Sequence, residues 1–334
     1  MEYNEPGADN QFKPGTYSRS ADMEQNSLFS VMRGTKKKAA VEAAAQAIFT
    51  FCGFLAVLAV GVIVAYMIAS GTPALARAGW KEILFGTVWR PGGEEPRYGI
   101  FYCILSSLAG TLLAVLIGAP VGVLTAVFLA ELADKRLAGI LRAAVELLAG
   151  IPSVIYGLLG IYLLNPMMYR LERWIFAGSE THQFTGGANL LSASLILAVM
   201  ILPTVVNISE AAIRAVDPGI RRASLALGAS RIQTIFGSVL PAAKPGIMTA
   251  VVLGVGRALG EAMAITLASG NSVNFPLPFH SVWFLTSAIV SEMGYAQGTH
   301  RQVLFTAGLV LFVLIMLVNL VLARIMKEGL VQDG

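Results

Sequence analysis

The chain has 334 residues, of which 56% are hydrophobic and 13% are charged, and its formal net charge is +4. A soluble domain carries about 25% charged residues, so this chain has too little polar surface to cover a water-soluble body. The composition argues against a soluble enzyme, a disordered chain and a nucleic-acid binder, and it predicts an integral membrane protein. The 34 glycines and 14 prolines favour a helical polytopic one, because transmembrane helices tolerate both residues.

The first 42 residues precede every long apolar run and contain six lysines and arginines. Because basic residues concentrate on the cytoplasmic side of membrane proteins, this cluster predicts a cytoplasmic N-terminus. Residues 1–32 are polar and have few large apolar side chains, so residues 1–42 are predicted to form a flexible cytoplasmic extension. A regulatory or docking tail is the functional alternative to a solvated one.

Six mostly apolar runs follow, and each is long enough to cross a bilayer as a helix. They predict an all-α, polytopic membrane helix bundle over residues 43–326, with a cytoplasmic tail at 327–334. With the N-terminus inside, the inner segments contain sixteen lysines and arginines and the outer loops contain seven, which supports this orientation. The predicted spans are 43–69, 101–130, 138–164, 188–211, 243–268 and 303–325.

The cytoplasmic loop 212–242 between the fourth and fifth spans contains strong local signals for two short helices. Asp217 followed by Pro218 predicts a helix start, because the carboxylate can cap the first turn and proline has no donor to lose there. This helix is expected to run through Leu227. Gly228 then lies where a helix commonly ends in a left-handed residue.

The second helix of this loop is predicted to begin at Ser230, with Gln233 completing a capping box, and to end at Pro241. Five apolar residues recur at helical spacing and form one face. An amphipathic helix of this kind rests on lipid or docks into a groove on a partner, and its sequence leaves both alternatives open. The apolar residues are Ile232, Ile235, Phe236, Val239 and Leu240.

Two ionisable residues, Arg257 and Glu261, lie inside the fifth predicted span. Arg257 is about 20 Å along the helix from Lys244, where a mid-bilayer arginine costs about 2.5–3.5 kcal/mol. Glu261, four residues on, is predicted to lie on the same helix face. A structural ion pair is one interpretation, and a polar station on a translocation path is the other.

The station would suit an oxyanion, since a guanidinium presents a fork of donors that matches phosphate oxygens. Glu261 can hold Arg257 in position or accept a hydrogen bond from a protonated phosphate. That second role favours phosphate over sulfate, which carries no proton near neutral pH.

Signals for catalysis, cofactors and metals are missing from the sequence. No GxxxxGK[ST] loop occurs, so the chain itself is not expected to hydrolyse ATP. The three histidines, His182, His280 and His300, fall in predicted outer loops without metal-ligand spacing, and they are expected to be solvated. No residue is assigned a catalytic, cofactor-binding or metal-binding role.

The 217–241 segment resembles the EAA loop of binding-protein-dependent ABC transporter permeases. The resemblance rests on Arg222-Ala223-Ser224, on Gly228 and on Leu240-Pro241. It implies that this segment is the coupling helix that fits a groove on a cytoplasmic ATPase, with Gly228 and the 230–240 helix transmitting force. The sequence departs from the motif at Arg222, which replaces the usual glutamate and reverses the charge.

Longer stretches resemble the PstC subunit of phosphate ABC transporter permeases, over residues from about 98 to 326. The clearest is "GRALGEAMAITLASGN", which contains both Arg257 and Glu261. The others are "VELLAGIPSVIYGLLGIYLL", "ILPTVVNISE", "ASLALGAS" and the last span, which contains Asn319.

This resemblance implies an ABC importer type I permease fold in a bacterial inner membrane. It also implies phosphate as the transported ion and contact of Arg257 and Glu261 with it. The implied partners are a PstA-type permease subunit, a cytoplasmic ATPase dimer and a periplasmic phosphate-binding protein, besides membrane lipid. The alternatives are a permease for another oxyanion, such as sulfate or molybdate, and a phosphate-status sensor or scaffold that carries nothing.

Overall fold

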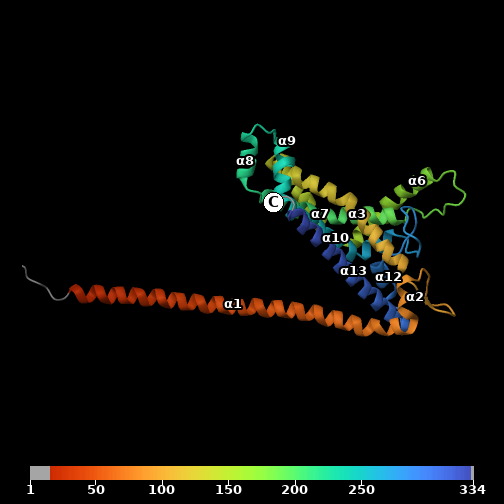
Figure 1. Cartoon of the computed structure of the whole chain (residues 1–334), viewed down its shortest axis with the longest axis horizontal. Coiled ribbons are helices and arrows are strands. Elements are labelled where there is room, and N and C mark those ends of the chain that lie inside the picture. Colours follow the sequence, from red (N-terminus) through yellow and green to blue (C-terminus); the bar gives the residue numbers. More distant parts are fainter. Residues whose placement is uncertain (1–15, 332–334) are drawn as a thin grey trace, which may run out of the picture. The chain divides into compact units, whose positions relative to one another are not determined.

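The computed structural model describes residues 16–331, and the chain divides after Ala65 into two units. Six helical segments are long and apolar enough to cross a membrane, which confirms the predicted all-α polytopic architecture (Figure 1). These segments are Val41–Phe85, Phe101–Leu132, Ser153–Ile175, Leu190–Arg214, Arg231–Gly260 and Gly298–Arg324.

Most of the described part of the chain is helical, and four helical segments include a π turn (η). Two short strands, β1 (Trp89–Arg90) and β2 (Arg97–Tyr98), pair antiparallel as a small hairpin. The helical elements are α1 (Thr16–Ala74), η1 (Leu75–Gly79), α2 (Trp80–Phe85), α3 (Phe101–Val127), η2 (Phe128–Leu132), α4 (Lys135–Gly150), α5 (Ser153–Leu159), η3 (Gly160–Leu164), α6 (Asn165–Ile175), α7 (Leu190–Arg214), α8 (Pro218–Ala226), α9 (Arg231–Thr234), η4 (Ile235–Val239), α10 (Leu240–Gly260), α11 (Met263–Ala268), α12 (Leu285–Glu292) and α13 (Gly298–Val331).

The N-terminal segment differs from its prediction. Helix α1 begins at Thr16, so residues 16–42 are helical where a flexible extension was expected. The segment 16–42 contains a single glycine, Gly34, no proline, and many residues of high helix propensity, so nothing in it interrupts a helix that continues into the first span. Residues 1–15 and the end of the predicted tail, 332–334, lie outside the described residues.

Helices α3, α7 and α10 pack against one another and form the centre of the bundle. Glycines allow α3 to approach its neighbours closely. A Cβ atom at Gly118 would lie 2.9 Å from the carbonyl oxygen of Ala198, and one at Gly122 would lie 2.8 Å from the side chain of Val205. Small residues at such positions are typical of membrane helices in close contact.

Two of the predicted spans are interrupted. The third predicted span, 138–164, contains two helical segments: α4, and α5 continued by η3. Ile151 and Pro152 separate these two segments. The break follows from Pro152, which has no N–H to donate and disfavours a helical residue before it. The fifth span also breaks, because α10 ends at Gly260 and α11 begins at Met263.

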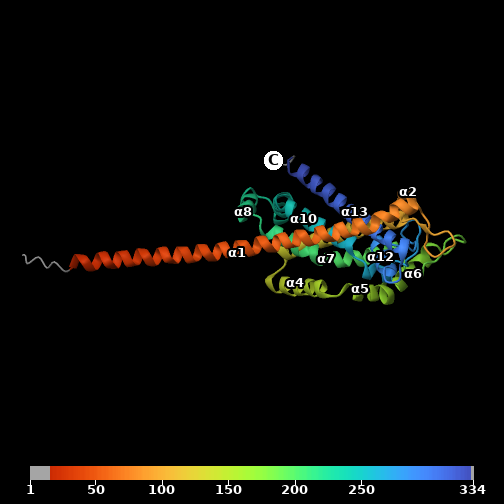
Figure 2. The same ribbon diagram turned by 90° about the horizontal axis from the view of Figure 1, so that it is seen from below.

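The two ends of the bundle carry different structures (Figures 1 and 2). Helices α8 and α9 lie together at one end, whereas α2 and α12 lie toward the other. Because α7 leads into the loop containing α8 and α9, and α10 leads out of it, this loop joins two of the three central helices.

Candidate functional site

Arg257 lies on α10 and reaches toward α7. Its Nη1 donates a hydrogen bond to Oγ1 of Thr204, at 3.3 Å. Among the side chains that the structure describes, the guanidinium has no ion-pair partner, and the side chain is exposed in this chain. The predicted structural ion pair with Glu261 is therefore absent from the described residues.

Glu261 does not share a helix face with Arg257, so that prediction is wrong. The helix ends at Gly260, and Glu261 has an extended backbone, with φ −71° and ψ 136°. Its Oε1 accepts from the backbone N–H of Ala264 at 3.1 Å, and its carbonyl oxygen accepts from the hydroxyl of Thr286 at 2.6 Å. Glu261 thus caps the start of α11 at the break between two membrane helices.

The arrangement around Arg257 suits the binding of an anion. A guanidinium has five N–H donors in a planar fork, and among the described residues this one makes a single, long hydrogen bond, to a neutral hydroxyl. A cation inside an apolar span is costly unless a partner, water or a ligand offsets the charge. The planar donors of a guanidinium match the oxygens of an oxyanion.

The loop 212–242 folds largely as its local signals predict. The side chain of Asp217 accepts from the N–H of Gly219 at 2.6 Å, Pro218 begins α8, and α8 ends at Ala226. Gly228 has φ +85°, the left-handed conformation that favours glycine. These caps and turns confirm the first helix and the glycine turn.

The second helix of the loop begins as predicted but does not end at Pro241. Ser230 and Gln233 form the capping box, and the helix continues through α9, η4 and α10. In the π turn η4, the N–H of Leu240 bonds to the carbonyl of Ile235. A π turn widens the backbone just before the proline, so the ring enters without the clash that ends an ordinary helix.

The predicted apolar face of this helix is divided between the core and the surface. Ile235 and Val239 are buried against the ends of α3 and α7. Ile232 and Phe236 are each 53% exposed, and Leu227 at the tip of the loop is 90% exposed. Arg222 and Ala223 are exposed on α8, while Leu240 is half-buried and Pro241 is exposed.

A cluster that the sequence did not reveal, made of Glu131, Arg221 and Arg231, fixes the loop to the bundle. Arg221 donates to Oε1 of Glu131 through Nε at 2.9 Å and Nη2 at 2.7 Å, and to the carbonyls of Ile213 and Val216. Arg231 donates to the backbone carbonyl of Glu131. Glu131 lies near the end of η2, which continues α3, and it precedes Arg221 by 90 residues. No local sequence pattern therefore indicates this pairing.

A second carboxylate, Glu210, was also missed. It is 5% exposed and pairs with Arg142 of α4 at 2.5 Å and with Arg214 of its own helix at 2.8 Å. An acidic residue inside the fourth predicted span was the available signal, because buried charges are normally paired. The pair fixes α4 to α7 beside the loop.

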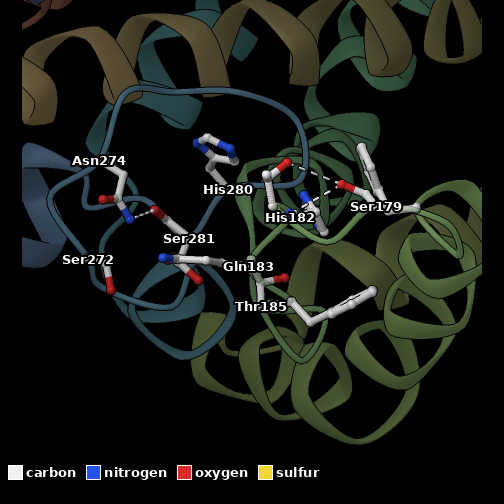
Figure 3. Close-up of a pocket in the computed structure, with 11 residues that line it drawn as sticks. Ser179, His182, Gln183, Thr185, Ser272, Asn274, His280 and Ser281 are labelled. Carbon is white, nitrogen blue, oxygen red and sulfur yellow. Dashed lines mark hydrogen bonds between the residues drawn. The ribbon is translucent and has the colours of Figure 1, made fainter.

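The opposite end of the bundle contains a polar cavity of about 480 Å³ (Figure 3). It lies between the segment after α6 and the segment before α12, which contribute Gln183 and His280 among other polar side chains. Asn274 donates to the carbonyl of Ser281 at 3.0 Å and fixes one wall.

The expectation of solvated histidines is wrong for two of the three. His182 pairs with the fully buried Glu172 at 2.8 Å, and His300 pairs with the buried Glu292 at 2.6 Å. Local acidic neighbours, ten and eight residues away, stabilise the buried imidazoles. In the part of the chain that the structure describes, no group of three potential ligands could hold a metal ion.

Known proteins resemble this chain over most of its length. Residues 118–330 match the family model described as "Binding-protein-dependent transport system inner membrane component". The probable ABC transporter permease protein YqgH of Bacillus subtilis is 37% identical over 278 residues, which cover 82% of this chain and 87% of that protein. The phosphate transport system permease protein PstC of Haemophilus influenzae is 33% identical over 277 residues, which cover 78% and 87%.

Solved structures share the fold at low sequence identity. A bacterial ABC transporter involved in the import of the acidic polysaccharide alginate aligns with a TM-score of 0.56 and 19% identity, covering 93% of this chain and 99% of that one. The MetNI methionine ABC transporter in an inward-facing conformation aligns with a TM-score of 0.50 and 22% identity, covering 67% and 93%.

Proposed function

The chain belongs to the family of binding-protein-dependent transport system inner membrane components, and from this we propose that it is the membrane-spanning permease subunit of an ATP-driven importer of inorganic phosphate. Phosphate is favoured by the relatives that carry the name of phosphate transport system permease, at 31–33% identity. The observation that carries the proposal within this chain is Arg257, a cation with free donors on a membrane-spanning helix.

In this proposal Arg257 contacts phosphate as it crosses the membrane. Its planar donors bind two phosphate oxygens at once, and the negative charge of phosphate offsets the cost of a cation at membrane depth. In this proposal Glu261 also takes part: the carboxylate oxygen that does not bond to Ala264, Oε2, accepts a hydrogen bond from a protonated phosphate. Because sulfate has no such proton at neutral pH, Glu261 supplies discrimination between the two anions.

The loop 212–242 is the proposed docking element for the ATPase. Its exposed apolar side chains, Leu227, Ile232 and Phe236, suit insertion into a groove on a partner, since an amphipathic helix buries this face when it docks. Ile235 and Val239 anchor the same helix to the bundle. Arg222 then presents a positive charge to the partner where the family motif has a negative one.

The remaining partners follow from the family. In this proposal a PstA-type permease lies beside this chain in the membrane. Two ATPase subunits bind on the cytoplasmic side, and a periplasmic phosphate-binding protein binds on the outer side. A related alginate transporter has been solved in complex with a pentasaccharide-bound periplasmic protein. ATP hydrolysis belongs to the ATPase subunits, and both termini of this chain are assigned to the cytoplasm of a bacterial cell.

Transport then proceeds by alternating access. The loaded binding protein delivers phosphate at the outer face, and closure of the ATPase dimer moves the loop 212–242. Movement of the loop is passed to α7 and α10, which are continuous with it. The path past Arg257 opens alternately to the outside and the inside.

Reconstitution of the complete complex in proteoliposomes tests this function. We expect ATP-dependent accumulation of radiolabelled phosphate that sulfate and molybdate do not inhibit. If sulfate or molybdate inhibits the accumulation of labelled phosphate more strongly than unlabelled phosphate does, the chain is a permease for another oxyanion. Absence of flux from an assembled complex that still hydrolyses ATP favours a sensor or scaffold.

A further inference from the structure

Thr204 lies close to the middle of α7, and its hydroxyl is the group that Arg257 contacts. In that bond the Thr204 oxygen accepts, so its own proton remains available for donation. Threonines in other membrane helices donate this proton to the carbonyl four residues earlier, as Thr125, Thr249 and Thr266 do. Among the backbone groups and side chains that the structure describes, no acceptor takes the proton of Thr204.

We infer that Thr204 is a second phosphate-binding residue, which donates its hydroxyl proton to one phosphate oxygen while Arg257 binds the others. This inference rests on the proposed transport of phosphate. The contact of 3.3 Å between Nη1 and Oγ1 places both donors against one small volume. In the bond between Arg257 and Thr204, only the arginine donates. A tetrahedral anion has several acceptor oxygens, so it can accept from the guanidinium and from the threonine hydroxyl at once.

The two donors lie on the two helices that flank the coupling loop. Thr204 belongs to α7, which ends at Arg214, and Arg257 belongs to α10, which begins at Leu240. A displacement of the loop that moves α7 relative to α10 therefore changes the separation of the helices that hold phosphate. When α7 and α10 separate, one phosphate cannot contact both donors, so affinity falls and the ion is released in step with the ATPase cycle.

Two substitutions test the hydroxyl specifically. Thr204→Val removes the hydroxyl while keeping the volume, and Thr204→Ser keeps the hydroxyl. In the complete reconstituted complex, the measured quantity is phosphate transported per ATP hydrolysed. We expect Thr204→Val to lower this ratio about tenfold, the scale of one hydrogen bond to a charged group, and Thr204→Ser to remain within about threefold of the unmodified complex.

Thr125→Val is the matched control, because it removes a hydroxyl that bonds only to the carbonyl of Val121. Its ratio of phosphate to ATP is expected to equal that of the unmodified complex. An unchanged ratio for Thr204→Val, or an equal loss in Thr204→Ser, overturns the role of Thr204. If the Thr204→Val complex does not assemble, Thr204→Ala supplies the same comparison. Failure of the unmodified complex to carry phosphate refutes the proposed function instead.

Discussion

Arg221 and Glu131 are 90 residues apart in the chain, and two guanidinium nitrogens of Arg221 donate to one carboxylate oxygen of Glu131, at 2.9 and 2.7 Å. The same guanidinium also bonds to the carbonyls of Ile213 and Val216, at the end of α7. One side chain therefore connects α8, the end of α3–η2 and the end of α7. This connection fixes α8, within the loop 212–242, to the helices that the loop is proposed to move.

Arg221→Lys is expected to weaken coupling between ATP hydrolysis and transport. Lysine keeps the charge but cannot reproduce the forked contact with Glu131 and the two carbonyl bonds together. We predict a three- to tenfold fall in phosphate transported per ATP. Arg136→Lys is the control, since Arg136 is exposed, and a fall of the same size in that variant would contradict the role of Arg221.

Phe236→Ala is expected to weaken docking of the ATPase, and Ile235→Ala is expected to destabilise the permease. Phe236 is exposed, so its loss lowers copurification with the ATPase but leaves the thermal unfolding midpoint of the detergent-solubilised permease unchanged. Ile235 is 2% exposed, and its truncation costs about 2–5 kcal/mol through the cavity that it leaves. Normal ATPase copurification with Phe236→Ala would argue against docking through this face.

Gly228→Ala is expected to strain the turn between α8 and α9. No atom lies within 4 Å of the Cβ position, so the effect comes from the backbone, where φ is +85°. A residue with a Cβ in that region costs about 1–2 kcal/mol. Faster amide exchange in α8 and α9 is the predicted result. Gly228→Asn should be milder, because asparagine tolerates this conformation, and equal exchange in both variants contradicts the backbone argument.

Gly110→Ala is expected to destabilise the centre of the bundle. Its Cβ would lie 2.5 Å from the ring of Phe284, so helix α3 or the aromatic side chain has to move. Overpacking of this kind costs about 1–3 kcal/mol, which lowers the thermal unfolding midpoint. Gly139→Ala is the control: no atom lies within 4 Å of the Cβ position, so it should not lower the unfolding midpoint. Equal midpoints for the two variants would contradict the packing argument.

Features that depend on neighbouring residues were predictable from the sequence. The cap at Asp217, the turn at Gly228 and the capping box at Ser230 each involve groups within a few residues of one another. The number of spans was also predictable, because hydrophobic length alone determines it. The third span was misplaced: it was predicted at 138–164, whereas the apolar segment is Ser153–Ile175 and α4 precedes it.

Features that depend on tertiary structure were not predictable. The π turn before Pro241 replaced an expected helix end, and the break after Gly260 separated Arg257 from Glu261. The contact of Arg257 with Thr204 joins two residues that lie on different helices and are 53 positions apart in sequence. No periodicity within either helix specifies such a pair.

The central claim is that Arg257 binds phosphate in transit, and the most direct measurement is ATP-dependent phosphate uptake by the reconstituted complex with Arg257→Gln. Glutamine keeps hydrogen-bonding groups but removes the charge and is two bonds shorter, and Arg257→Lys keeps the charge at nearly the full length without the planar fork. We predict uptake at least about tenfold lower for Arg257→Gln, and an intermediate rate for Arg257→Lys, with the complex assembled in both. Uptake by Arg257→Gln at the rate of the unmodified complex would contradict the account.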